Sequence, residues 1–190
     1  MEKKLDNIIN NLFGDSMDIK RIFINTTIEL IKENSFEDIT VSKIIKRAQL
    51  SRSSFYRYFH DKYDVVNEAY LECCEAEILK KYKKRSDRHL EIYRYIYENQ
   101  SYFKKVLKTT GQNSFSDFYQ NNVKNWYIKA YQSNYPNQQL TDEILFKADI
   151  AAHSTICSLK KWVNEGCRVT VENIYSWSFD LLPEDFKFHK

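Results

Sequence analysis

Basic, hydroxyl and tyrosine side chains gather in one short stretch of the sequence, residues 40–62. This stretch holds six lysines and arginines against a single acid, Asp61, so positive charge is concentrated there. Cationic side chains neutralise phosphates, and hydroxyl groups donate hydrogen bonds to phosphate oxygens. The stretch therefore predicts contact with a nucleic acid, although the net charge of the whole chain is only +3.

Two short helices are expected within this stretch, over residues 40–47 and 52–59. Thr40 begins the first and Ser51 precedes the second, and both are residue types that cap helix N-termini. The few residues between the two segments leave room only for a tight turn, which is typical of a helix-turn-helix. Apolar residues recur at helical steps at Val41, Ile44, Ile45 and Ala48, and then at Phe55 and Phe59.

A third helix is expected to hold this pair in place. Residues 17–34 carry an apolar stripe with the period of a helix, and Phe36 and Ile39 would close a small core. Residues 17–63 are thus predicted to form a three-helix DNA-binding domain. Residues 1–16 would form an arm that reaches an adjacent groove, or a short extra helix that packs on the surface or frays. The stripe is formed by Ile19, Ile22, Phe23, Thr26, Leu30 and Ile31.

The remainder of the chain, residues 64–190, also reads as helical. Three glycines and two prolines in 190 residues favour long uninterrupted helices. A helix over residues 61–79 would join the two parts, and the basic residues between 80 and 88 would form a solvated linker. Later breaks are expected near Asn99, at 111–114, at 135–139 and at Gly166. We therefore predict an all-α protein with a C-terminal helical domain, and the patterns described next favour ligand binding and dimerisation as the roles of that domain.

Aromatic residues are dense in this second part. Aromatic side chains at helical spacing fill a core, or they line a cavity for an apolar or aromatic small-molecule effector. Both interpretations stay open from the residues alone. The candidate effector-binding residues are Tyr93, Tyr97, Phe103, Phe118, Tyr119, Trp126 and His153.

Small and apolar residues alternate at three- and four-residue steps over residues 141–166, and a second apolar face follows. This pattern is typical of a helix seam, and we expect it to form a homodimeric four-helix bundle. A seam within one chain is the alternative. The predicted interface residues are Leu145, Ala148, Ala152, Thr155, Leu159, Trp162, Ile174, Ser178 and Leu181.

Several classes of protein are disfavoured by what the sequence lacks. It has no apolar run long enough to span a membrane and no signal-peptide pattern, so a cytoplasmic location is expected. It has no glycine-rich phosphate loop and no nucleophile motif, and no cofactor is predicted. The four histidines are scattered and the four cysteines form no C-x-x-C pair, so neither a metal site nor an enzyme is expected.

Residues 48–62, AQLSRSSFYRYFHDK, resemble the signature of TetR/AcrR-type bacterial transcriptional regulators, roughly Ala-Gly-Val-Ser-x-Gly-Thr-Phe-Tyr-x-Tyr-Phe-x-x-Lys. The resemblance implies a repressor that binds a palindromic operator as a homodimer and is controlled by an effector in the C-terminal domain. Gln49 and Ser53 stand where the family usually has glycine. A left-handed backbone at Gln49 would cost about 1 kcal/mol.

Carried over position by position, the resemblance implies two kinds of DNA contact. Base edges would be read by Arg52, Ser53 and Arg57. Phosphates would be contacted by Thr40, Ser42, Ser51, Tyr56, Tyr58 and Lys62.

A second, weaker resemblance concerns residues 161–166, KWVNEG, followed by Val171 and Ile174. It is similar to a branch of the family that includes activators of dihydroxyacetone-kinase operons. This branch implies an alternative, a transcriptional activator controlled by a protein partner with no small-molecule pocket. The residues themselves do not fix whether the protein represses or activates.

Overall fold

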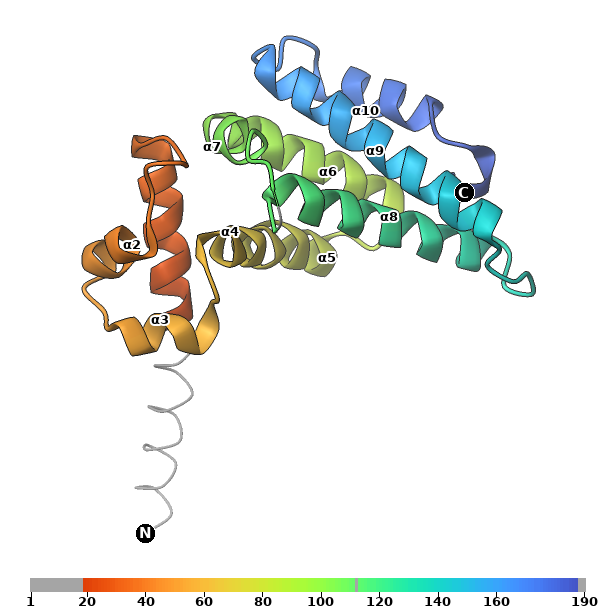
Figure 1. The fold of residues 1–190 in the computed structure, drawn as a ribbon. Coiled ribbons are helices and arrows are strands. Elements are labelled where there is room, and N and C mark those ends of the chain that lie inside the picture. The colour runs from red at the N-terminus through yellow and green to blue at the C-terminus, as the bar shows by residue number, and fades with distance from the viewer. Residues whose placement is uncertain (1–18, 112, 188–190) are drawn as a thin grey trace. The chain divides into compact units, whose positions relative to one another are not determined.

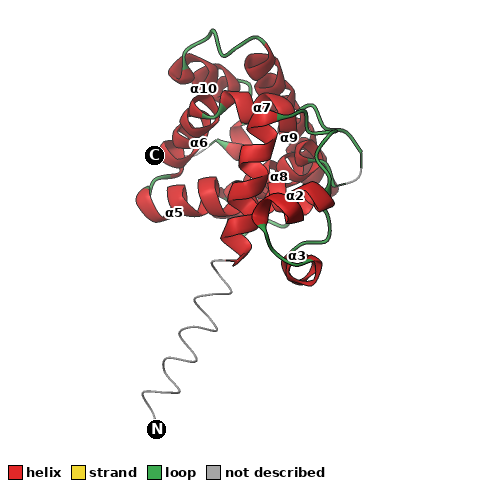
Figure 2. Ribbon diagram, turned by 90° about the vertical axis from the view of Figure 1, so that its left-hand side faces the viewer, coloured by secondary structure: helices red, strands yellow, loops and turns green. Residues whose placement is uncertain are grey.

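A computed structural model of the protein describes residues 19–111 and 113–187 (Figure 1). Within that part the chain forms helices and loops and no strand (Figure 2), so the all-α prediction is confirmed. The chain divides into two compact units, Met1–Ala69 and Tyr70–Lys190. The arm or extra helix expected for residues 1–16 lies outside the described residues.

The first unit contains a helix that includes residues 19–33, followed by α2 (Val41–Ala48), α3 (Arg52–Tyr58) and most of α4 (Lys62–Tyr70). The Phe23 ring lies edge-on to Phe55, with the ring centroids 5.3 Å apart, and Phe59 completes the cluster. Phe36 and Ile39 are buried, as predicted. These apolar contacts hold the helices of the helix-turn-helix together.

One residue of the first predicted stripe points the wrong way. Ile22 is 41% exposed, whereas Ile24, which the prediction omitted, is fully buried. The buried face runs through Phe23, Thr27 and Ile31 at four-residue steps. Neighbouring positions on both edges of a helical stripe fit a 3.6-residue period almost equally well, and only the partner helices decide between them.

Local residue chemistry sets the ends of α2 and α3. The Thr40 hydroxyl accepts the Lys43 amide N–H at 3.2 Å, and the Ser51 hydroxyl accepts the Ser54 N–H at 3.0 Å. Both predicted N-caps are therefore confirmed. Gln49 ends α2 in the left-handed region, with φ 55° and ψ 34°. The strain expected for a residue other than glycine is present in the turn.

The helix expected over residues 61–79 is not a regular α-helix. The Asp61 carboxylate caps α4 by accepting the Asp64 N–H at 2.8 Å. After Tyr70 the chain continues as a π-helical segment, Leu71–Ala76, and then as α5 (Glu77–Lys81). The apolar pattern alone cannot reveal such a segment, because its wider turn changes the angle between successive residues only locally.

The second unit continues with α6 (Arg85–Glu98), α7 (Gln100–Val106), α8 (Phe115–Asn134), α9 (Asp142–Asn164) and α10 (Val171–Asp180). A short 3-10 turn, Glu184–Phe186, follows. All four predicted helix breaks are present. Helix α8 packs along α9, and α10 packs against α6 and α9 (Figure 1). This bundle encloses the cavities described below.

Candidate nucleic-acid interface

Helix α3 separates an apolar side from a polar one. Phe55 is fully buried in the core of the first unit, whereas Arg52, Ser53, Tyr56 and Arg57 are exposed. The first turns of α2 and α3 contain no acidic residue, so no carboxylate on them repels a phosphate. Helix α3 therefore presents cations, hydroxyls and one aromatic ring on a single accessible side.

Arg52 and Tyr56 lie one helical turn apart and contact each other. The Arg52 guanidinium donates to the Tyr56 hydroxyl at 3.4 Å, and its carbon lies 5.4 Å from the centre of the ring. A guanidinium that lies along an aromatic ring has fewer orientations than one free in water. The contact leaves other N–H groups of Arg52 for a base edge, where a bidentate contact to guanine is the usual one.

The hydroxyl groups predicted to meet phosphates surround the start of α2 and α3. Thr40, Ser42 and Ser51 are exposed. The Ser51 oxygen lies 2.8 Å from the Ser53 oxygen and 2.8 Å from the Ser54 oxygen, which gives a compact hydroxyl cluster. Since Thr40 acts only as an acceptor in its cap, its hydroxyl hydrogen can still be donated to a phosphate. The Ser51 hydroxyl has three partners, so a hydrogen free for a phosphate lies on Ser53 or Ser54 of the same cluster.

Lys62 has a different environment from the other predicted contacts. Its ammonium donates to the backbone carbonyls of Phe36 and Ile39, both at 2.8 Å, and lies 4.3 Å from the centre of the Phe36 ring. Burial lowers the pKa of Lys62, against the raising effect of Glu37, Asp38 and Asp61. Two of its three N–H bonds are thus used inside the unit. This environment favours a structural role for Lys62, while the phosphate contact implied by the resemblance stays a prediction for its third N–H.

Two other cations near α2, Lys43 and Arg47, are held by a carbonyl and an acid. Lys43 donates to the Asp38 carbonyl at 2.7 Å, and the Arg47 guanidinium forms an exposed ion pair with Glu33 at 2.9 Å. Lys46 is exposed on the same helix. The sequence prediction counted these residues in the charge of the stretch but did not include them among the DNA-binding candidates.

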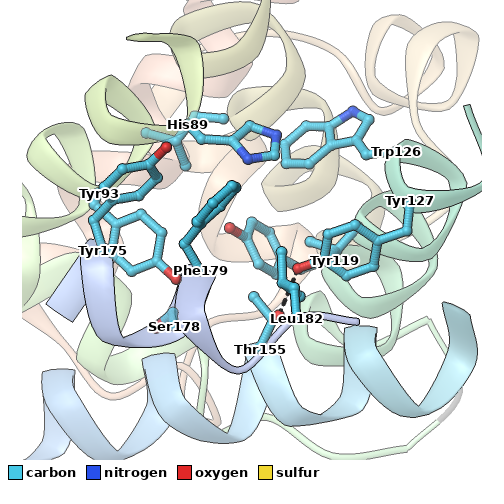
Figure 3. A pocket seen from close by; sticks show the side chains of 12 residues that line it. His89, Tyr93, Tyr119, Trp126, Tyr127, Thr155, Tyr175, Ser178, Phe179 and Leu182 are labelled. Carbon is cyan, nitrogen blue, oxygen red and sulfur yellow. Dashed lines mark hydrogen bonds between the residues drawn. The ribbon is translucent and has the colours of Figure 1, made fainter. Parts of the chain in front are cut away.

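Three of the predicted effector-binding residues, Tyr93, Tyr119 and Trp126, surround one cavity of the second unit (Figure 3). The cavity measures about 30 Å³. This is roughly the volume of one water molecule in the liquid, whereas pockets for drug-sized ligands measure about 300–1,000 Å³. Tyr127 closes one side by a 2.7 Å hydrogen bond with Thr155. Burial raises the pKa of the Tyr119 phenol well above its ordinary value. This inner cavity is a nearly filled core.

The other four candidates lie outside the inner cavity. Phe103 is buried against Phe115, and Phe118 packs against the same ring. Tyr97 stacks on Trp162, with centroids 6.3 Å apart. His153 is exposed, with its ring nitrogen 3.3 Å from the Gln120 side-chain oxygen. These residues do not form the single aromatic cavity that the sequence suggested.

A second cavity of about 220 Å³ has a different set of lining residues. It shares Trp126, His89 and Ile92 with the inner cavity, and it adds charged side chains at its edge. We name it the outer cavity. Of its lining residues, the sequence prediction named Trp126 as an effector-binding candidate and assigned Arg88 to a solvated linker. The lining residues are Glu75, Ile78, Leu79, Arg88, His89, Ile92, Trp126 and Lys129.

The predicted dimer seam on α9 requires a correction. Ala148, Ala152, Leu159 and Trp162 are buried within one chain, so their side chains cannot contact a second copy. Helix α9 packs against α8, α7 and α10, and its Trp162 contacts Tyr93 and Tyr97 of α6. A three-four pattern reports an apolar face and does not show which helix covers it. Of the other predicted residues, Leu181 is exposed, and Leu145, Thr155, Ile174 and Ser178 are half-buried.

No group of histidine, cysteine and acidic side chains in the described residues is arranged to hold a metal ion. Within the same residues, no helix combines the length and the apolar character that a membrane crossing requires.

Two family models match the chain. The model described as "Bacterial regulatory proteins, tetR family" matches residues 23–69, and the model described as "Transcriptional regulator C-terminal region" matches residues 86–182. The first covers the helix-turn-helix, and the second covers both cavities apart from Glu75, Ile78 and Leu79. No curated protein sequence matches the chain.

Solved structures share the fold at low sequence identity. A protein named dihydroxyacetone kinase operon activator DhaS has a TM-score of 0.60 at 21% identity, over 86% of this chain and 93% of that one. A TetR transcriptional regulator from Streptococcus agalactiae 2603V has a TM-score of 0.60 at 20% identity, over 87% of this chain and 93% of that one. The regulator FadR from Bacillus subtilis, solved in complex with stearoyl-CoA, has a TM-score of 0.54 at 17% identity, over 88% and 99%.

Proposed function

The chain belongs to the TetR family of transcriptional regulators, and we propose that it is a homodimeric repressor that binds a palindromic operator under the control of an effector. As a member of this family it is a DNA-binding transcription factor and not an enzyme. The resemblance in residues 48–62 had already implied the family.

The exposed side of α3 carries the proposal for operator binding. Arg52, Ser53 and Arg57 lie there with Tyr56, on a helix whose opposite side is fixed in the core by Phe55. A recognition helix inserted in the major groove reads base edges with such side chains. The hydroxyls of Thr40, Ser42 and Ser51 and the phenol of Tyr58 would then position the unit on phosphates.

Exposed apolar residues on α9 and α10 support the proposed homodimer. Phe146 is 66% exposed, Ile150 and Trp177 are each 54% exposed, and Leu181 is 71% exposed. Clusters of exposed apolar residues mark interaction surfaces, and a two-fold homodimer covers the same patch on both copies. We propose this face, with the half-buried Leu145 and Ile174, as the interface in place of the buried seam residues.

The first test is a footprint of the purified protein on DNA from just upstream of its own gene. A dimer should protect two half-sites one helical turn, or a multiple of it, apart. Arg52→Ala should reduce discrimination at one position of each half-site by about 1–3 kcal/mol. Arg168→Ala, which removes an exposed arginine of the second unit, is the control and should change nothing. Equal affinity for an unrelated duplex at every salt concentration would overturn the proposal.

A second candidate function differs in what controls the regulator. An activator controlled by a protein partner, with no small-molecule pocket, is favoured by the nearly filled inner cavity of about 30 Å³. A reporter gene placed behind the footprinted site distinguishes repression from activation. Deletion of the regulator's gene raises reporter expression if the protein is a repressor and lowers it if the protein is an activator.

A further inference from the structure

We propose that the outer cavity binds a small organic acid with one carboxylate and a flat, apolar body. The inference rests on the proposed function, since it names the chemical class of an effector for this regulator. All of the lining residues belong to the second unit. The site can therefore be assessed without reference to the DNA-binding unit.

The body of the cavity is apolar and partly aromatic. Ile78 and Ile92 are almost fully buried beneath it, and Leu79 is exposed at its edge. The rings of His89 and Trp126 are in contact and tilted against each other, with centroids 5.2 Å apart and planes inclined by 32°. Two neighbouring rings and three branched aliphatic side chains suit a ligand whose body is a ring or a short hydrocarbon.

Two cations at the edge favour an anionic ligand. Arg88 is fixed by its Nε, which donates to the Tyr82 carbonyl at 2.6 Å, and its two terminal nitrogens make no hydrogen bond within the described part of the chain. Lys129 is exposed and forms no ion pair with any described residue. Both cations line the same cavity, and a guanidinium or an ammonium binds a carboxylate through charge-assisted hydrogen bonds.

The one acid in the lining is already satisfied. One Glu75 oxygen accepts from the Asn122 amide at 2.8 Å, and the other accepts from the Trp126 indole at 3.3 Å. Glu75 thus holds the indole ring in place as a wall of the cavity. With two cations against one hydrogen-bonded carboxylate, the lining has an excess of one positive charge, and a monoanion neutralises it.

The volume sets the size of the acid. A cavity of about 220 Å³ is several times larger than one water molecule and smaller than the roughly 300–1,000 Å³ of drug-sized pockets. A single-ring acid fits this range, and a long acyl chain does not. The inner cavity lies behind the wall formed by His89, Ile92 and Trp126, and it has no room for the remainder of a longer ligand.

The test is isothermal titration of the full-length protein, without DNA, with sodium phenylacetate, benzyl alcohol, benzylamine and sodium palmitate. Phenylacetate should bind saturably. Benzyl alcohol and benzylamine should bind at least about tenfold more weakly, because neither offers a carboxylate to the two cations. Palmitate keeps the carboxylate and should still bind at least about tenfold more weakly, because its chain is too long for a cavity of about 220 Å³. Phenylacetate should also change the tryptophan fluorescence, and Trp126→Phe should remove that change.

Matched variants assign the binding to this cavity. Lys129→Gln should weaken phenylacetate at least about fivefold, since it removes one partner of the carboxylate. Lys160→Gln makes the same charge change on α9, away from the cavity, and should leave the affinity unchanged. Saturable binding of no acid, equal binding of benzyl alcohol, or equal effects of the two substitutions would overturn the inference.

The inference about the outer cavity and the proposed operator-binding function can be refuted independently of each other. If phenylacetate does not bind but the footprint on upstream DNA is present, the inference about the outer cavity is wrong and the operator-binding function stands. If phenylacetate binds and no specific DNA site is found, the cavity stands and the proposed function is wrong.

Discussion

Replacing Lys62 by methionine separates a structural lysine from a phosphate-binding one. Methionine keeps an unbranched side chain that can pack on the Phe36 ring, and it removes the ammonium that donates to the Phe36 and Ile39 carbonyls at 2.8 Å. The substitution therefore frees the loop before α2 from the start of α4 without opening a large cavity in the core.

The expected loss of stability follows from those two hydrogen bonds. Each bond from a charged donor contributes roughly 1.5–3 kcal/mol in a buried site. Lys62 is only half-buried, and water can replace part of each bond. Removing the ammonium also relieves the desolvation that lowers its pKa. A net loss of about 2 kcal/mol in the free energy of unfolding of the first unit is therefore expected.

Urea unfolding measured with two signals localises the effect. All three tryptophans, Trp126, Trp162 and Trp177, belong to the second unit, so their fluorescence reports that unit, whereas far-ultraviolet ellipticity reports both. Lys62→Met should lower the ellipticity midpoint. Lys46→Met removes an exposed cation of α2 and should change the stability by less than about 0.5 kcal/mol.

The salt dependence of binding to a random-sequence duplex completes the test. Removal of a cation that binds one phosphate should reduce the slope of log affinity against log salt by about 0.9. We expect that reduction for Lys46→Met and an unchanged slope for Lys62→Met. A reduced slope with unchanged stability for Lys62→Met would refute the structural role and restore the phosphate contact implied by the family resemblance.

Three further predictions concern the second unit. Leu181→Glu should raise the dimer dissociation constant at least about tenfold in analytical ultracentrifugation, whereas the control Ile22→Glu should not; dimers of equal affinity would remove α10 from the interface. Iodoacetamide at pH 8 should modify exposed Cys157 and spare Cys74, whose pKa is raised by burial, as mass spectrometry of the native protein would show; equal labelling would contradict that burial. Burial raises the pKa of Tyr119, as it does for Tyr70, Tyr102 and Tyr127, so the stability that these neutral phenols contribute is complete below pH ~10. Above that pH only the unfolded phenols ionise, and each should lower the free energy of unfolding by about 1.4 kcal/mol per pH unit; urea midpoints independent of pH between 8 and 11 would contradict this.

The helix-turn-helix could be predicted from the sequence because its determinants are local. Thr40 and Ser51 cap helices through amides three residues away, and Gln49 turns the chain by its own backbone angles. The same holds at Gly166 and Cys167, whose positive φ angles of 78° and 52° end α9 where the sequence predicted a break. In each case the interaction spans only a few residues, so its partners are visible in the sequence.

The dimer seam and the cavities could not be predicted, because their partners are distant along the chain. The step pattern of Ala148, Ala152 and Leu159 shows that one side of α9 is apolar, and it does not show whether a helix of the same chain or of a second copy covers it. The outer cavity is the space that the side chains of α5, α6, α8 and the π-helical segment leave unfilled. Its volume is small compared with the volume of the side chains around it. The residue pattern of a single helix cannot predict how much space its packing with other helices leaves unfilled.

Lys62 and Arg88 show how far charge by itself specifies a role. Both belong to basic runs in the sequence, one ascribed to DNA contact and the other to a solvated linker. In the structure each is held by backbone carbonyls, Lys62 by Phe36 and Ile39 and Arg88 by Tyr82. A carbonyl presents the same acceptor whatever its side chain, so residue types cannot reveal such a pair. What distinguishes the two cations is the number of donors left over: one N–H on Lys62, and both terminal nitrogens on Arg88. That difference makes Arg88 the better candidate for binding an anion.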